Sequence, residues 1–351
     1  MQEVSMPNMI KKVHLTILTL FTLFLTTLAA CTSESRNNMN IEQPNYYIKL
    51  NMQGCQRIVA VNGFEVESDF DGYSSAAEIP INHLIKNGDN YFELMVPSKE
   101  TIEENWPDDS NCAVEVRVKG IAAGDTVDYK VADIIFSADY SSPSTNLTKN
   151  SMLSGAYQFE NGKTVLVDHA QDSIVSDIKK LPVYEEGMDG VFQRTFTANV
   201  PFPKWAFFDG DELFGGYHPI NNEEEYDSAK AIIWPKVQEL WDLFESKQLD
   251  KILPLFEFRS KEYDQAFYRE EGSTLKQLKN SLENVYASNY PLNKREETDM
   301  QFVVSFANNL VTIVNAGTYN GTVMFYDAET DSNTFYDVYW MKKDGEWIIA
   351  R

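Results

Sequence analysis

The spacing of apolar residues changes once along this chain, and that change divides it into two parts. In the first part, apolar and polar residues alternate in short runs, as they do strictly from Val114 to Val118. Asn62-Gly63 separates two short strand-like runs, Ile58–Val61 and Phe64–Val66, and this pair readily adopts the positive φ angles that a two-residue hairpin turn requires. Many short strands with Gly and Asn turns predict a β-sandwich domain over residues 46–200.

From residue 223 the apolar period becomes helical. Apolar side chains recur at steps of three and four from Ile233 to Phe244, which is the stripe of one helix face. Thr274 and Gln277 are spaced as a capping box and predict the start of a further helix. Strands then follow to the end of the chain, so we expect an α+β domain with an antiparallel sheet over residues 223–351.

Helices followed by antiparallel strands that end in Gly345-Glu346-Trp347-Ile348 resemble the cone-shaped fold of nuclear-transport-factor-like and ketosteroid-isomerase-like proteins. The resemblance implies helices wrapped around a bent sheet, often with a cavity. An isomerase-like pocket would need a carboxylate and a tyrosine or histidine aimed inward, and no histidine follows His218. Half-buried packing is the alternative role for helix tyrosines. The candidates for such a pocket are Asp264, Tyr268, Tyr286 and Asp337.

Two segments lack either period. Residues 31–45 are polar and predict a flexible tether. Residues 201–222 contain Pro201 and Pro203, which disfavour helix, together with aromatic and acidic residues. They predict an extended connector whose aromatic rings pack on a domain. The expected class is therefore a two-domain, mainly β plus α+β protein.

The beginning of the chain has the three parts of a secretory signal peptide. Lys11 and Lys12 precede an apolar run, and small residues lead up to Cys31. The ending Leu28-Ala29-Ala30-Cys31 resembles the lipobox of bacterial lipoproteins. The resemblance implies that residues 1–30 are a signal peptide and that Cys31 becomes the acylated first residue, a palmitate-bearing membrane anchor.

This resemblance also implies an address. Lipoproteins without aspartate after the cysteine are carried to the outer membrane, and Thr32 follows Cys31 here. We therefore expect a lipid-anchored protein on the periplasmic side of the outer membrane. An ordinary cleavable signal or a single membrane-spanning helix are the alternatives, although the apolar run is shorter than a span requires and is interrupted by threonines.

The chain is strongly acidic, with 53 Asp and Glu against 30 Lys and Arg. A net charge of −23 disfavours nucleic acid and anionic lipid surfaces as partners and favours a basic protein partner or simple solubility. One acidic segment also carries an aromatic anchor, which suits contact with a basic surface. A merely solvated charge run is the alternative. The candidate contact residues are Trp106, Glu103, Glu104, Asp108 and Asp109.

With Cys31 assigned to lipid, Cys55 and Cys112 remain. An exported chain meets an oxidising compartment, so these two predict one disulfide bond, with two buried free thiols as the alternative.

The common signatures of catalysis and metal binding are missing from the sequence. There is no Gly-x-Ser-x-Gly elbow and no His-Glu-x-x-His, and no motif ties a nucleophile to Asp168-His169. Asp209 and Asp211 suggest calcium, but Leu213 and Phe214 replace the Asp or Asn and the Gly of an EF-hand loop. An acidic turn is the simpler interpretation. We expect no metal and no cofactor, and a binding protein rather than an enzyme.

The sequence as a whole favours a non-enzymatic lipoprotein that binds a basic protein partner, similar to periplasmic immunity or adaptor lipoproteins. A small-molecule binder or isomerase-like protein that uses the C-terminal cavity is one alternative. Carbohydrate binding by the sandwich is another, and it would require exposed coplanar aromatic rings on one face. Val61-Asn62-Gly63 with the segment Ile79–Asn90 resembles the jelly-roll sandwich found beside the catalytic barrel of some β-galactosidases.

Overall fold

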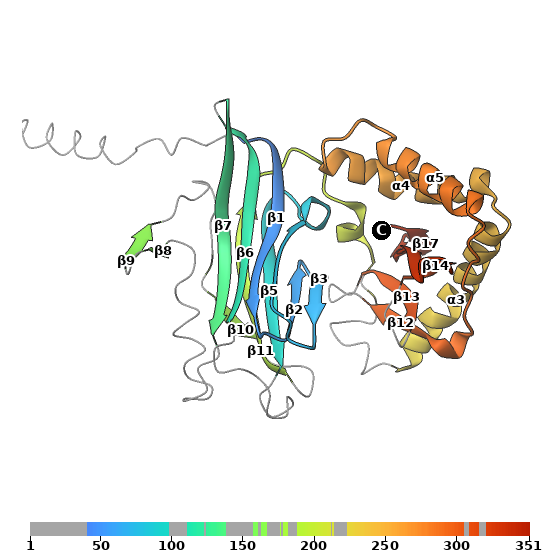
Figure 1. Cartoon of the computed structure of the whole chain (residues 1–351), viewed down its shortest axis with the longest axis horizontal. Helices are drawn as coiled ribbons and strands as arrows, with labels where there is room; N and C mark the ends of the chain where they lie inside the picture. The colour runs from blue at the N-terminus through green and yellow to red at the C-terminus, as the bar shows by residue number, and fades with distance from the viewer. Residues whose placement is uncertain are drawn as a thin grey trace, which may run out of the picture. The chain divides into compact units, whose positions relative to one another are not determined.

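The architecture is that of a computed structural model (Figure 1). Within the ranges it describes, the chain is mainly β, with several antiparallel sheets and three α-helices. This confirms the predicted class, mainly β with an α+β part. The structure describes residues 41–97, 111–122, 124–137, 157–160, 163–166, 176, 178–181, 188–211, 213, 223–304, 309–315 and 321–351.

The first sheet has the strand order β4-β1-β6-β7, with every neighbouring pair antiparallel. Apolar and polar residues alternate strictly in β6 and more weakly in β1, and Ile48 and Leu50 of β1 are buried beside Val116 and Val114 of β6. The strands are β1 (Glu42–Gln53), β4 (Ser75–Pro80), β6 (Asn111–Ala122) and β7 (Asp125–Ser137).

The second sheet has the order β10-β11-β5-β2-β3, again antiparallel throughout. The Asn62-Gly63 hairpin joins β2 to β3 with φ angles of 50° and 78°, as a two-residue turn of this type requires. The strands are β2 (Arg57–Val61), β3 (Phe64–Asp69), β5 (Gly88–Pro97), β10 (Lys179–Leu181) and β11 (Met188–Ala198). A separate hairpin pairs β8 (Tyr157–Glu160) with β9 (Lys163–Leu166).

The inward faces of these two sheets share one hydrophobic core, in which Ile48 of the first sheet and Phe92 of the second are both fully buried. A disulfide between Cys55 and Cys112 links the sheets, with the two Cα atoms 5.8 Å apart. Cys55 precedes β2 and Cys112 lies in β6. The disulfide predicted from the cysteine count is therefore confirmed.

The C-terminal part places three helices before its strands, the order expected from the period change. A four-stranded sheet has the order β12-β13-β16-β17, and β14 and β15 form a hairpin. The elements are α3 (Glu223–Glu245), α4 (Leu249–Ala266), α5 (Ser273–Ala287), β12 (Met300–Val304), β13 (Val311–Asn315), β14 (Val323–Asp327), β15 (Ser332–Tyr336), β16 (Trp340–Lys343) and β17 (Glu346–Ile349).

The capping box predicted at Thr274 and Gln277 is wrong. The residue that precedes helix α5 is Gly272, two positions before Thr274; its φ angle is 84° and it offers no side-chain cap. The carboxylate of Asp264 in α4 takes the part of the cap, because its Oδ1 accepts the Thr274 backbone N–H at 2.9 Å and the Thr274 hydroxyl at 2.5 Å. A residue ten positions earlier thus satisfies the start of the helix.

The aromatic residues of the connector were predicted to pack on a domain, and Trp205 and Phe207 do so, since both are buried in the core shared by the N-terminal sheets.

The described part of the chain also contains short 3₁₀ turns at Asn82–Leu84 (η1), Ala206–Asp209 (η2) and Glu297–Asp299 (η4). The Asn82 side chain donates a hydrogen bond of 2.6 Å to the carbonyl of Ala266 at the end of α4. None of the helices in the described ranges is long and apolar enough to cross a membrane.

Candidate interaction site

Two aromatic rings project into solvent from the loop between β3 and β4, residues 70–74, which we call the 70–74 loop. Phe70 is 58% exposed and Tyr73 is 69% exposed. They are the two most exposed large hydrophobic side chains in the part of the chain that the structure describes. Exposed aromatic side chains that lie close together in sequence mark binding surfaces more often than scattered ones do.

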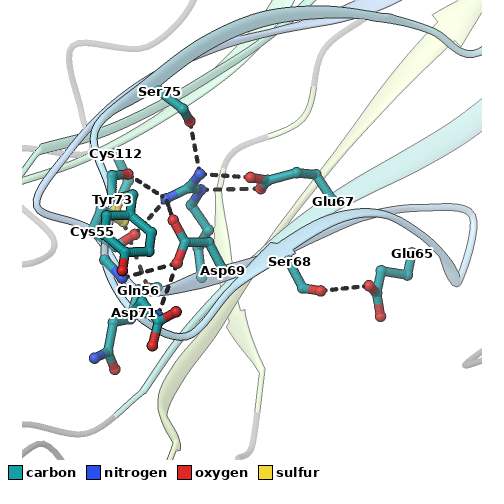
Figure 2. A network of polar contacts seen from close by, with 12 residues as sticks. Cys55, Gln56, Glu65, Glu67, Ser68, Asp69, Asp71, Tyr73, Ser75 and Cys112 are labelled. Atoms are coloured by element: carbon teal, nitrogen blue, oxygen red, sulfur yellow. Dashed lines mark hydrogen bonds and ion pairs between the residues drawn. A yellow bond between two sulfur atoms is a disulfide. The ribbon is translucent and has the colours of Figure 1, made fainter. Parts of the chain in front are cut away.

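A buried arginine beneath the loop holds it in place. Arg57, only 1% exposed, makes a two-pronged ion pair with Glu67, with Nε–Oε2 and Nη2–Oε1 distances of 3.0 Å and 2.5 Å. Its Nη1 also pairs with Asp69 Oδ2 at 3.0 Å (Figure 2). Glu67 and Asp69 lie at the end of β3, immediately before the loop. Their ion pairs with the guanidinium therefore fix the direction in which the loop leaves the strand.

The same guanidinium also binds the far side of the loop. It donates to the carbonyl of Tyr73 at 3.2 Å and to the hydroxyl of Ser75 at 2.8 Å. A further bond of 2.7 Å reaches the carbonyl of Cys55, whose sulfur is tied to Cys112. All three guanidinium nitrogens therefore have acceptors, which a buried arginine requires. We call Arg57 and these acceptors the Arg57 network.

The turn inside the loop is set by its own acidic residue. Asp69 Oδ1 accepts the backbone N–H groups of Asp71 at 2.8 Å and of Gly72 at 2.9 Å. Gly72 has a φ angle of +75°, which suits glycine and strains other residues. An Asp two and three residues before the amides that it accepts is a local turn signal. The ring positions are thus pre-organised by both local and tertiary contacts.

The surroundings of the two rings are acidic. Glu65, Glu67, Asp69 and Asp71 lie within seven consecutive residues, and Arg57 is the cation that pairs with two of them (Figure 2). The Glu65 carboxylate binds the Ser68 hydroxyl at 2.7 Å. Aromatic anchors with a carboxylate rim suit a cationic partner, which such a field attracts before contact.

The contact residues predicted from the sequence around Trp106 lie outside the described residues, as does Cys31. The ends of the segment that carries Trp106 are described, however. Before it, Met95 of β5 pairs with Ile58 of β2, next to Arg57. After it, Cys112 of β6 is bonded to Cys55.

The four pocket candidates of the C-terminal part have separate surroundings, and no hydrogen bond or ring contact joins any two of them. Asp264 is 2% exposed and caps α5. Tyr268 donates to the carbonyl of Pro44 at 3.2 Å, and burial raises its pKa. Tyr286 packs against Phe325 with its hydroxyl unpartnered, and burial raises its pKa to about 12.

Asp337 follows β15. Burial raises the pKa of its carboxyl, while Arg259 and Arg351 act in the opposite direction. Its side chain lies over Gly321, where a Cβ atom would come within 2.1 Å of Oδ1.

The acidic turn of the connector contains ordinary structural contacts. Asp209 forms an ion pair with Lys204, and the Asp211 N–H donates to the Lys342 carbonyl at 2.8 Å. Among the described residues there is no group of three or more His, Cys, Asp or Glu side chains able to share a metal ion.

Sequence reasoning missed Arg57 and the 70–74 loop. The local signal was present, because Asp69-Phe70-Asp71-Gly72-Tyr73 places two aromatic residues around an Asp-x-Asp-Gly turn. The Arg57 contribution had no local signal, since the side chains that it binds, those of Glu67, Asp69 and Ser75, lie 10 to 18 positions away. Comparison with protein families, with curated proteins and with solved structures found no match to this chain.

Proposed function

We propose that this protein is a lipid-anchored, non-enzymatic binding protein that captures a basic segment of another protein with the 70–74 loop. The observation that carries the proposal is the pair of exposed rings, Phe70 and Tyr73, held by a buried arginine and rimmed by carboxylates. A rigid aromatic loop loses little conformational entropy on binding, and the acidic rim selects cationic partners.

The proposal includes the address and the finer architecture expected from the sequence. The acylated Cys31 would hold the protein at the periplasmic side of the outer membrane. The tether would be shorter than the range 31–45 expected from the sequence and would end at residue 41, because β1 begins at Glu42. The two N-terminal sheets would be the β-sandwich, and residues 223–351 the cone-shaped domain. The core between the two N-terminal sheets supports the sandwich, and the order of helices before strands supports the cone-shaped domain.

The test is binding of synthetic Lys- and Arg-rich peptides, measured by biolayer interferometry on the immobilised chain. Counterparts in which every basic residue is replaced by glutamate are the peptide control. We expect the double variant Phe70→Ala, Tyr73→Ala to lose about tenfold or more in affinity, the scale of a small hot spot. Phe335→Ala removes a ring that is 39% exposed on β15 and serves as the matched control.

The dependence of peptide affinity on salt concentration separates the electrostatic contribution to binding from the contribution of the aromatic rings. Affinity for the basic peptides should fall clearly between about 0.05 M and about 0.5 M sodium chloride, because the rim carboxylates of Glu65 and Asp71 are exposed and therefore screened by salt. Binding that is indifferent to both salt and the double variant would contradict the proposal.

Carbohydrate binding is a second candidate, and the same two exposed rings favour it. Sugar rings stack on exposed aromatic faces, and such contacts are insensitive to salt. A glycan array probed at about 0.5 M sodium chloride distinguishes the two candidates. Glycan binding that persists there and is lost in the Phe70→Ala, Tyr73→Ala variant would support carbohydrate as the ligand.

A further inference from the structure

A second feature lies away from the 70–74 loop and concerns arginines without carboxylate partners. Among the arginines in the described ranges, Arg57, Arg117 and Arg194 each have a carboxylate oxygen within 4.0 Å. Arg259 and Arg351 are half-buried and have none within that distance. The chain carries 53 acidic residues against 30 basic ones, so acidic residues are plentiful, yet none of those that the structure describes forms an ion pair with Arg259 or Arg351.

The two arginines approach the same place from different elements. Arg259 of α4 donates from Nη1 to the carbonyl of Asp337 at 3.0 Å. The backbone of Arg351 pairs with that of Tyr339, which lies two residues after Asp337. The Tyr339 N–H donates to the Arg351 carbonyl at 2.7 Å, and the Arg351 N–H donates to the Tyr339 carbonyl at 3.3 Å. Both guanidinium groups also interact electrostatically with the Asp337 carboxylate and the Tyr263 hydroxyl.

Aromatic rings enclose the charges. The Arg351 guanidinium carbon lies 5.7 Å from the ring centre of Phe64 and 5.7 Å from that of Tyr339. The Arg259 guanidinium carbon lies 4.8 Å from the ring centre of Phe256. These rings support the guanidinium faces. Apart from the Arg259 Nη1 bond to the Asp337 carbonyl, they leave the N–H edges, the parts that bind oxyanions, for other partners.

A buried polar atom without a hydrogen-bond partner lies near these two arginines. Nδ1 of His83 is buried and makes no hydrogen bond. The His83 ring is 5.9 Å from that of Tyr263, which follows Arg259 by one helical turn. Arg351 also acts on this imidazole, and burial together with that charge holds the pKa of His83 well below its ordinary value. A neutral imidazole can donate to an anion without adding a charge.

Mutual repulsion is visible at the arginines themselves. Burial, and after it the charge of Arg351, lowers the pKa of Arg259 to about 10. An ion pair that only stabilised the fold would place a carboxylate between the two groups, as Glu67 and Asp69 are placed on Arg57. At Arg259 and Arg351 the nearby carboxylate of Asp337 stays beyond ion-pair distance.

We infer that Arg259 and Arg351, with His83 beside them, form a binding site for the oxyanion group of a small organic molecule, a carboxylate, phosphate or sulfate. Two guanidinium groups bind such a group through paired N–H donors, and the bound charge removes their repulsion. This site is separate from the 70–74 loop and goes beyond the proposed function.

The experiment is thermal unfolding of the full chain with sodium phosphate, sulfate or benzoate, at an ionic strength held constant with sodium chloride. We expect a saturable rise of the midpoint by about 5 °C at a hundredfold excess over the dissociation constant. The anion with the lowest dissociation constant indicates the chemical class of the natural ligand: a phosphate ester, a sulfate ester or a carboxylic acid. Isothermal titration calorimetry with that anion gives the affinity.

Arg259→Gln and Arg351→Gln should each abolish the saturable rise, whereas Arg295→Gln, a change at an exposed arginine, should leave it intact. Asp337→Asn should tighten binding by at least about fourfold, because it removes a like charge near the anion. A purely structural role for the arginines predicts no such gain.

The inference is overturned if none of the three anions raises the midpoint beyond sodium chloride alone. It is also overturned if Asp337→Asn leaves the affinity unchanged while both arginine variants merely unfold. Phe70→Ala with Tyr73→Ala should not alter anion binding, so the failure of the proposed function and the failure of this site can be told apart.

Discussion

Replacing Arg57 by methionine tests whether a buried cation supports the 70–74 loop. Methionine retains much of the length and apolar volume of the arginine stem but none of its donors. The change leaves Glu67 and Asp69, whose side chains are 23% and 13% exposed, without their cation. It also removes the donors to the carbonyls of Cys55 and Tyr73.

The expected loss follows from these contacts. Breaking a buried ion pair by removing one partner costs about 3–5 kcal/mol, because the other charge is left uncompensated. Glu67 and Asp69 retain some exposure and can partly rehydrate, which favours the lower end. We therefore expect Arg57→Met to lower the free energy of unfolding by about 3 kcal/mol. Glu67→Gln keeps the shape and removes one charge, so it should cost about 1 kcal/mol.

The assay is equilibrium urea unfolding of the oxidised protein, followed in parallel by tryptophan fluorescence and far-ultraviolet circular dichroism. Arg295→Met is the matched control, because Arg295 is exposed and a surface change of this kind stays within about 0.5 kcal/mol. Hydrogen exchange provides a local readout, since the amides of Asp71 and Gly72 should exchange faster in Arg57→Met. Equal losses in Arg57→Met and Arg295→Met, with unchanged exchange at those amides, would refute the reasoning.

Three further predictions concern other parts of the molecule. Replacing Cys55 and Cys112 by serine should lower the free energy of unfolding by about 4 kcal/mol, because their separation of 57 residues closes a long loop, and urea unfolding of oxidised and double-variant protein measures it. Burial raises the pKa of Glu262 to about 7 despite the Ala206 N–H and the charge of Lys343, so the folded state binds this proton more tightly than the unfolded state. The stabilising contribution of the protonated Glu262 is present below the ordinary glutamate pKa and is lost as pH rises through about 7. The difference in thermal midpoint between Glu262→Gln and the unchanged protein should therefore favour the variant more at pH 8 than at pH 5. The same difference at both pH values would contradict this. Cys31→Ser should abolish palmitate labelling and release the protein from the membrane fraction of cells, and a variant that stays membrane-bound would exclude the anchor.

Local chemistry accounts for much of the fold. Alternation from Val114 to Val118 specifies that β6 is buried on one face, and Asn62-Gly63 specifies the hairpin between β2 and β3, because both depend on neighbours in sequence. The disulfide between Cys55 and Cys112 followed from a count of cysteines. The capping box failed for the opposite reason, since a residue of the preceding helix supplied the cap.

What the tertiary structure decided is which charges meet and which do not. Arg57 and Glu67 look like ordinary surface residues in the sequence, yet β2 and β3 pair so that the guanidinium is buried against that carboxylate. Arg259 and Arg351 are distant in sequence and converge only because α4 and the end of the chain pack on one another. Periodicity determines which face of an element is apolar, but side-chain charges act through space. The candidate sites of this protein therefore emerged only once the strands and helices were packed.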